Sequence, residues 1–227
     1  MDFQSKTNKP IKGVYDMKKL DMKKNEYTGN LISFCGLDGC GKTTMISKLN
    51  SYFKEKNTEL KNTKQPTGFV RESEIFRTFM DCPDHEAFEY RSLSLLAASD
   101  RVQHTNKIVV PWLREGYTVI SDRYFYSCIA NLHARGYEDD QWIYEVAKWI
   151  IKPDFAFFLD VPVELAIERV RKREYEKERY IDIDLQYKLR DLYLKIAEMN
   201  NGIIISTEVS EEETFKKIKE ELEGAKI

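Results

Sequence analysis

The chain has 227 residues, of which 42% are hydrophobic, and this is enough apolar material for a single domain with one substantial core. Its 36 basic and 38 acidic residues nearly balance, so the net charge of −2 gives no argument for a nucleic-acid-binding or membrane-surface protein. The four cysteines lack metal-binding spacing, and no apolar run is long enough to span a bilayer. These features predict a cytoplasmic protein with reduced thiols.

The first 29 residues are polar and rich in lysine, and they show no regular apolar period. We therefore predict that residues 1–29 form a solvated N-terminal extension, with an interaction arm as the alternative. A single domain is expected to follow over residues 30–227.

Within that domain, short apolar segments alternate with amphipathic ones. Strands are predicted at 31–35, 59–64, 118–122, 155–160 and 203–205. Helices are predicted after the first strand (around Met45, Leu49 and Phe53) and at 72–80, 86–110, 141–151, 164–173, 185–199 and 211–223. This alternation is typical of an α/β fold with a central parallel sheet of about five strands flanked by helices.

A glycine-rich loop follows the first predicted strand, where residues 36–43 match the pattern G-x-x-x-x-G-K-[ST]. The glycines let backbone N–H groups surround phosphate oxygens, and the N-terminus of the next helix adds a positive dipole. Lys42 would reach the β- and γ-phosphates, and Thr43 would offer its hydroxyl to Mg²⁺. A structural glycine turn is the alternative, but the flanking strand and helix favour a nucleoside triphosphate site.

Polar residues also follow the third predicted strand, which ends at Asp122-Arg123. Because the carboxyl ends of parallel strands meet at one edge of a sheet, this pair is expected near the glycine-rich loop. A carboxylate at Asp122 would lie near Mg²⁺, directly or through water. The planar guanidinium of Arg123 suits the phosphate of an acceptor. An Asp–Arg surface ion pair is the alternative.

A run of charged residues at 169–179 contains six basic and three acidic side chains. A solvated charged helix is the simpler interpretation of such a run. Its place after the fourth strand and one helix favours a mobile lid, over about residues 169–180, that excludes water and delivers arginines to the transferring phosphoryl group.

Five segments together resemble the thymidylate kinases and, more loosely, the wider nucleoside monophosphate kinase family. The loop with its flanks reads F-C-G-L-D-G-C-G-K-T-T, residues 63–68 (T-K-Q-P-T-G) are similar to T-R-E-P-x-G, and residues 98–104 (A-S-D-R-V-Q-H) are similar to A-x-x-R-x-Q-H. Residues 122–127, with Arg135 and Gly136 downstream, are similar to D-R-Y-x-x-S…R-G. The resemblance covers nearly everything after residue 30 and implies a three-layer P-loop kinase fold, ATP with Mg²⁺, and a homodimer.

The resemblance also implies roles for individual residues. Asp38 would lie near the acceptor sugar and the transferring group, and Arg101 would reach the edge of the base. Since Gly39 stands where some members carry an arginine, the lid is expected to supply the catalytic arginine, and Arg169 to pack on adenine. The catalytic candidates are Asp38, Lys42, Arg123, Arg171, Arg173 and Arg179. The ATP-binding candidates are Gly36, Leu37, Asp38, Gly39, Cys40, Gly41, Lys42, Thr43, Thr44 and Arg169. The acceptor-binding candidates are Asp38, Gln65, Pro66, Arg77, Ala97, Arg101, Arg123, Ser127, Cys128 and Asn131.

The departures from the family pattern fall on the acceptor side. Lys64 and Gln65 replace arginine and glutamate, Ala97 stands where an aromatic ring stacks on thymine, and Asn131 stands where a tyrosine is expected. Replacement stacking is expected from Tyr90, Tyr124 or Tyr126, unless these are core aromatics.

The sequence therefore predicts a kinase that transfers the γ-phosphoryl of ATP to a nucleoside monophosphate, with dTMP as the expected acceptor. Two alternatives stay open at this point. One is a kinase for another nucleotide or nucleoside, and the other is a nucleotide-binding protein without catalytic activity.

Overall fold

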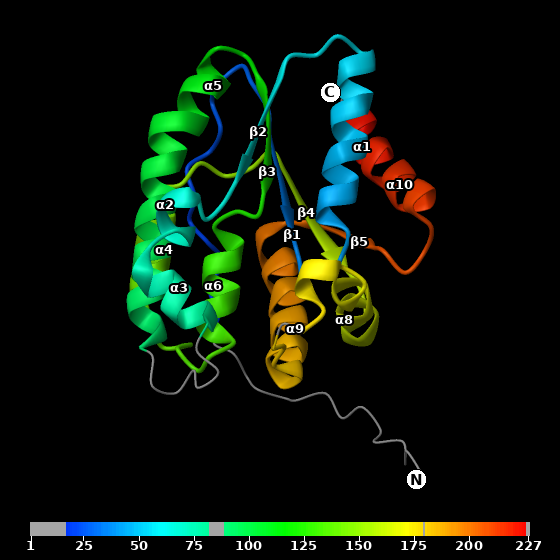
Figure 1. Cartoon of the computed structure of the whole chain (residues 1–227). Coiled ribbons are helices and arrows are strands. Elements are labelled where there is room, and N and C mark those ends of the chain that lie inside the picture. The colour runs from blue at the N-terminus through cyan, green and yellow to red at the C-terminus, as the bar shows by residue number, and fades with distance from the viewer. Residues whose placement is uncertain (1–16, 82–88, 179, 226–227) are drawn as a thin grey trace.

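The computed structural model describes residues 17–81, 89–178 and 180–225. Its centre is a parallel sheet of five strands in the order β2-β3-β1-β4-β5 (Figure 1). The strands are β1 Leu31–Cys35, β2 Leu60–Lys64, β3 Thr118–Asp122, β4 Phe155–Asp160 and β5 Ile203–Ser206. The predicted α/β architecture is confirmed, and every predicted strand is present.

The burial of the strands follows their place in the sheet. All five residues of β1 are buried, as are the first four of β3 and the first five of β4, because these strands are covered on both faces. β2 lies at an edge and its residues are exposed or only partly buried, which explains why its sequence is the least apolar of the five. In register, Phe34 of β1 lies between Asp122 of β3 and Phe157 of β4, so the two central loops emerge side by side.

Helices cover both faces of the sheet (Figure 1). The first helix, α1 (Lys42–Glu55), packs with the last, α10 (Glu211–Gly224), on one face. The other layer contains α4 (Tyr90–His104), α5 (Val110–Arg114), α6 (Tyr126–His133) and α9 (Ile183–Asn200). The remaining helical segments are α2 Gly68–Arg71, α3 Glu74–Asp81, α7 Trp142–Ala147, α8 Val163–Arg171 and the 3-10 turn η3 Glu174–Glu176. None of the helices in the described ranges is long and apolar enough to cross a membrane.

The helix predicted over residues 86–110 differs from the observed one at both ends. Its residues 86–88 lie outside the described residues, and helical structure continues to Arg114 through a π-helical turn, η2 (Thr105–Val109). Pro111 is the second residue of the last segment, α5 (Val110–Arg114), and because proline has no N–H it cannot continue the regular i→i−4 pattern. The π-helical turn widens the helix at this point, so the rod passes the proline without ending.

The helix predicted over residues 141–151 is too long. It ends at Ala147, after which Lys148, Trp149 and Ile150 form i→i+3 turn bonds. The chain then becomes extended at Ile151, which forms a parallel bridge with Lys23.

The bridge is part of the packing of the N-terminal segment, residues 17–29, against the domain. The Lys23 amide donates to the Ile150 carbonyl at 2.9 Å, and the Lys152 amide donates to the Lys23 carbonyl at 2.6 Å. Met17 and Leu20 are buried in the main core. The expectation of a solvated extension is therefore wrong for residues 17–29, because two apolar side chains and backbone pairing outweigh the polar composition. Residues 1–16 lie outside the described residues.

Candidate active site

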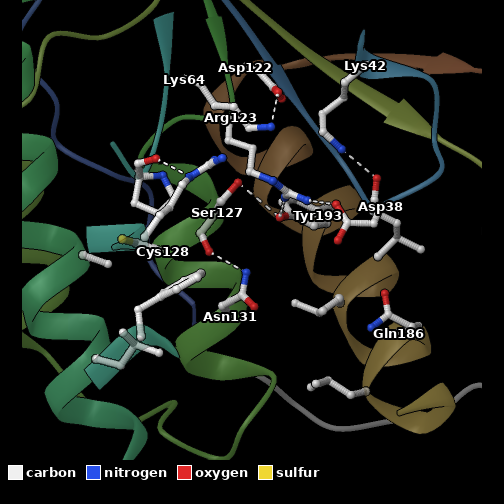
Figure 2. Close-up of a pocket in the computed structure, with 18 of the residues that line it drawn as sticks. Asp38, Lys42, Lys64, Asp122, Arg123, Ser127, Cys128, Asn131, Gln186 and Tyr193 are labelled. Carbon is white, nitrogen blue, oxygen red and sulfur yellow. Dashed lines mark hydrogen bonds and ion pairs between the residues drawn. The ribbon is translucent and has the colours of Figure 1, made fainter. Parts of the chain in front are cut away.

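A cavity of about 460 Å³ opens at the carboxyl ends of β1, β2 and β3, as expected for a ligand site in a sheet of this kind (Figure 2). The glycine-rich loop forms one wall, α4 and α6 form another, and α9 closes the third. The predicted site residues that line it are Leu37, Asp38, Gly39, Gly41, Lys42, Thr43, Pro66, Ala97, Arg101, Asp122, Arg123, Ser127, Cys128, Asn131 and Arg173.

The glycine-rich loop requires glycine at two crowded positions. Gly36 and Gly39 both have positive φ angles, 136° and 86°. A Cβ at Gly39 would lie 2.2 Å from the carbonyl oxygen of Ala166 in α8, and one at Gly36 would lie 2.5 Å from the carbonyl oxygen of Leu159. The loop therefore packs directly against the backbone of β4 and α8, with no room for a side chain at Gly39.

Lys42 is folded back onto the loop. It is the first residue of α1, only 7% of its surface is exposed, and its Nζ donates to the carbonyl oxygens of Gly36 at 3.1 Å and Leu37 at 2.7 Å. Neither partner carries a formal charge, so the ammonium is held close to where the loop and the helix N-terminus would receive phosphates. Thr43 lines the cavity beside it.

Asp122 has one engaged and one unengaged oxygen. Its Oδ2 forms an ion pair with Lys64 at 3.2 Å, whereas Oδ1 is buried and has no hydrogen-bond partner among the described residues. An unpaired carboxylate oxygen in the cavity that Thr43 also lines fits a hydrated Mg²⁺, which retains several water ligands. No group of three His, Cys, Asp or Glu side chains within the described ranges is arranged to hold a metal ion, so a metal here would take most of its ligands from phosphate and water.

Arg123 is the centre of a dense network of hydrogen bonds (Figure 2). Its Nη1 donates to the Gly36 carbonyl at 3.2 Å and to the Tyr193 hydroxyl at 3.1 Å, and its Nη2 forms an ion pair with Asp38 Oδ1 at 2.5 Å. Burial disfavours the charged guanidinium, but Asp38, together with the other nearby groups Tyr193, Asp122 and Cys40, more than offsets this, and the pKa of Arg123 is raised. The side chain is permanently cationic.

The backbone of Arg123 is held in an unusual conformation. Its φ is 66°, in the left-handed region that side chains other than glycine rarely adopt. The Arg123 amide donates to the Phe34 carbonyl at 2.9 Å, and the Ser121 hydroxyl donates to the Arg123 carbonyl at 2.7 Å. These bonds turn the chain sharply after β3 and direct the side chain back over the glycine-rich loop.

Three of the five guanidinium donors of Arg123 are used by these contacts. Within the described structure, Nε and the second Nη2 hydrogen form no hydrogen bond. Nε and Nη2 form one edge of the planar guanidinium, and such an edge can bind a phosphate or carboxylate through two parallel bonds. Arg123 is thus anchored on one side and available on the other.

The far end of the cavity combines aromatic and cationic groups. Arg135 lies with its guanidinium carbon 4.0 Å from the ring centre of Tyr90, and its Nη1 donates to the backbone and side-chain oxygens of Asn131 at 3.0 Å each. Burial raises the pKa of the Tyr90 hydroxyl. Arg101 is 3% exposed; its Nη1 donates to the Ala97 carbonyl at 2.9 Å, while its buried Nε has no partner in the described structure.

Of the three tyrosines considered as replacement stacking groups, only Tyr90 borders the cavity. Tyr124 and Tyr126 are fully buried in the main core. Tyr124 donates its hydroxyl hydrogen to the Ile151 carbonyl at 2.7 Å, so its role is structural.

Some predicted residues lie away from the cavity. Gln65 is fully buried and contacts His104 Nδ1 at 3.1 Å, and Arg77 is exposed on α3. Arg71 of α2 lines the cavity instead, and its Nε donates to the Pro66 carbonyl at 2.7 Å. Gly36, Cys40 and Thr44 support the loop without lining the cavity.

The lid arginines take different positions. Arg173 borders the cavity together with Glu176, to which it is paired at 3.4 Å. Arg171 donates to the Lys177 carbonyl, and Arg169 is tied to Thr207, beyond β5, by bonds of 2.8 Å and 3.3 Å. Neither of the latter two lines the cavity. Arg179 lies outside the described residues.

Sequence reasoning gave no site role to several lining side chains, among them Arg71, Arg135, Gln186 and Tyr193. The sequence could not show that Arg71 faces the cavity, because the orientation of the short helix α2 depends on the loop before it. Arg135 was quoted as part of a motif but given no role. Tyr193 and Gln186 belong to α9, whose apolar spacing indicated core packing and gave no signal for the site.

A parallel sheet, a glycine-rich loop that leads into a helix, and a carboxylate–arginine pair on the neighbouring strand together define a P-loop nucleotide-binding protein. Comparison with known proteins narrows this class. The model of the thymidylate kinase family matches residues 34–218.

The chain is also similar to individual thymidylate kinases. It is 39% identical over 173 residues to a probable thymidylate kinase of Pyrococcus horikoshii, covering 75% of this chain and 84% of that protein. It is 34% identical over 189 residues to a thymidylate kinase of a Geobacillus species, covering 80% and 89%. A thymidylate kinase of a Sulfurihydrogenibium species is 37% identical over 177 residues, covering 77% and 86%. The chain belongs to the thymidylate kinase family and is a nucleoside monophosphate kinase.

Proposed function

We propose that this protein transfers the γ-phosphoryl group of ATP to dTMP. The observation that carries the proposal is that a P-loop and Arg123, whose Nε forms no hydrogen bond within the described structure, border the same cavity, so that a donor triphosphate and an acceptor phosphate would meet there. Family membership and the names of the similar proteins support phosphoryl transfer to thymidylate.

On the donor side, the loop amides and the α1 N-terminus would bind the β-phosphate, and Lys42 would leave its carbonyl partners for the β- and γ-phosphates. Thr43 and the free oxygen of Asp122 would hold Mg²⁺, the second through water. When bound, Mg²⁺ supplies charge neutralisation for the transferring group.

On the acceptor side, Arg123 and Arg71 would bind the phosphate of dTMP. The unpaired Nε of Arg101 supports a hydrogen bond to the base edge. Since Ala97 provides no ring, we assign stacking on the base to Tyr90, which Arg135 holds in place and which lines the cavity together with Phe76 and Phe79. Asp38 would contact the sugar, next to Ser127, Cys128 and Asn131.

Of the lid arginines, Arg173 is the one we assign to the transferring phosphoryl group, because among the described candidates it alone borders the cavity. It would exchange its weak pairing with Glu176 for the negative charge that spreads over the equatorial oxygens. Arg169, anchored beyond β5, is proposed to pack on adenine.

We also propose a cytoplasmic homodimer. The described cysteines, Cys35, Cys40 and Cys128, are free thiols, which fits a reducing compartment. Exposed Leu95 and Trp149, 49% and 60% exposed, supply apolar surface for self-association. Light scattering during size-exclusion chromatography measures the oligomeric state.

An acceptor panel tests the proposed activity. The purified protein is incubated with ATP, Mg²⁺ and dTMP, dUMP, dCMP, AMP, GMP or thymidine, and the products are separated chromatographically. We expect dTDP from dTMP, no turnover after chelation of Mg²⁺, and a raised melting temperature with dTMP alone. Turnover of another acceptor with inert dTMP would show a different specificity, and ATP binding without acceptor-dependent ADP release would show loss of catalysis.

A further inference from the structure

Tyr193 lies in α9, far along the chain from the glycine-rich loop, yet its hydroxyl reaches the centre of the site (Figure 2). Only 4% of the residue is exposed. Its oxygen lies 3.1 Å from Nη1 of Arg123 and 3.1 Å from Oγ of Ser127. Nothing in the sequence marks this tyrosine, since its helical spacing with Leu189 and Ile196 is that of a core residue.

The chemistry of the groups determines the direction of these bonds. A guanidinium has only donors, so the Tyr193 oxygen must accept from Arg123, and the single hydroxyl hydrogen is left to donate to Ser127. Burial raises the pKa of Tyr193, which keeps that hydrogen in place at neutral pH. The hydroxyl therefore links α9, α6 and the loop after β3 through Arg123.

The other two contacts of the Arg123 side chain are both made with the glycine-rich loop. Gly36 and Asp38 belong to the glycine-rich loop, and both accept from the guanidinium. Tyr193 contacts the guanidinium from α9, outside the glycine-rich loop, and it shares Nη1 with Gly36. With the hydroxyl present, the plane of the guanidinium is held at three points.

We propose that Tyr193 is a positioning residue that directs the Nε–Nη2 edge of Arg123 toward the acceptor phosphate. The inference rests on the proposed function, because it assigns Arg123 to the acceptor. Without the hydroxyl, the ion pair with Asp38 and the contact with Gly36 would draw the guanidinium toward the donor side. Two parallel bonds to one phosphate need a fixed plane, so the cost would fall on acceptor binding.

The test is Tyr193→Phe, which retains the buried ring beside Phe158 and removes only the hydroxyl. Tyr187→Phe is the matched control, because Tyr187 also lies on α9 but its hydroxyl contacts Glu164 outside the cavity. We expect the dTMP KM of Tyr193→Phe to rise about tenfold, as for one lost bond to a charged group. The ATP KM and the melting temperature should stay close to those of the unmodified protein, and Tyr187→Phe should change neither KM.

An equal rise in both KM values, or an equal effect of Tyr187→Phe, would assign the change to helix packing and overturn the inference. An unchanged dTMP KM in Tyr193→Phe would overturn it as well. These outcomes are distinct from failure of the proposed function, which is tested by Arg123→Ala. If Arg123→Ala raises the dTMP KM, the proposed function stands, and Tyr193→Phe should then add less than about twofold in that background. Full additivity would show that Tyr193 acts on something other than Arg123.

Discussion

The donor and acceptor sides of the cavity are built in different ways. The donor side is a continuous stretch of chain, residues 36–43, whose backbone N–H groups would bind the phosphates. The shape of this stretch depends on glycine at crowded positions. The acceptor side is assembled from side chains of α2, α4, α6 and α9, which are far apart in sequence. A backbone site tolerates little change, whereas a side-chain site can exchange one residue for another. This contrast explains why the departures from the family pattern gather on the acceptor side.

The largest effect is expected from Lys42→Ala. The ammonium is needed for the charge that develops in phosphoryl transfer, so kcat should fall by about 10²–10³. Steady-state ADP release measures kcat. Circular dichroism and thermal unfolding provide the control, since both should be nearly unchanged. A folded Lys42→Ala protein with normal kcat would break the assignment of the donor side.

Gly39→Ala tests whether the donor loop depends on its backbone. Both the φ of 86° and the 2.2 Å approach to the Ala166 carbonyl oppose a Cβ there, so we expect a loss of about 1–3 kcal/mol in unfolding free energy. Urea unfolding measures it. Gly136→Ala is the matched control, because Gly136 also has a positive φ but its Cβ would meet nothing within 4 Å. Equal losses would show that φ strain alone matters and the contact with α8 does not.

Arg71→Ala and Arg77→Ala compare two arginines near the acceptor side. Arg71 lines the cavity and Arg77 does not, so the first should raise the dTMP KM about tenfold and the second less than about twofold. Both variants should leave the ATP KM nearly unchanged. The reverse ranking would restore the assignment that sequence spacing suggested.

The smallest effect concerns pH. His133 of α6, the helix that carries Ser127 and Asn131, is 1% exposed, and neither ring nitrogen has a partner among the described residues. Burial lowers its pKa, so the unfolded chain binds the proton more readily. The free energy of unfolding should therefore decrease as the pH falls below the ordinary histidine value of 6.5.

His133→Phe should make the unfolding free energy less dependent on pH between pH 7.5 and pH 5.5, measured by urea unfolding at each pH. His104 also has a pKa lowered by burial, and it contributes in the same direction. An unchanged pH dependence in His133→Phe would show that other groups cause the acid sensitivity. The stability of the acceptor-side helix α6 would then not be tied to a buried histidine.

Much of the fold could be predicted from local pattern. Apolar runs such as 31–35 and 155–160 matched the observed strands, since a strand buried on both faces has few polar residues. Errors arose where a long-range contact decided a local structure. Helix α7 ends early because the chain after it pairs with Lys23. Residues 17–29 pack on the domain because Met17 and Leu20 are buried in its core, and the polar sequence around these two residues gave no sign of this.

By itself, the sequence determined the glycine-rich loop, the Asp122–Arg123 pair and the alternation of strands and helices, because each depends on neighbouring residues and on the meeting of strand ends at one edge. Tertiary structure alone decided which side chains complete the acceptor side. Arg71 replaced Arg77 at the cavity, Gln65 was withdrawn into a contact with His104, and Tyr193 was brought against Arg123. The physical reason is that the direction of a side chain depends on the register and packing of its helix, and residues distant in the chain set both.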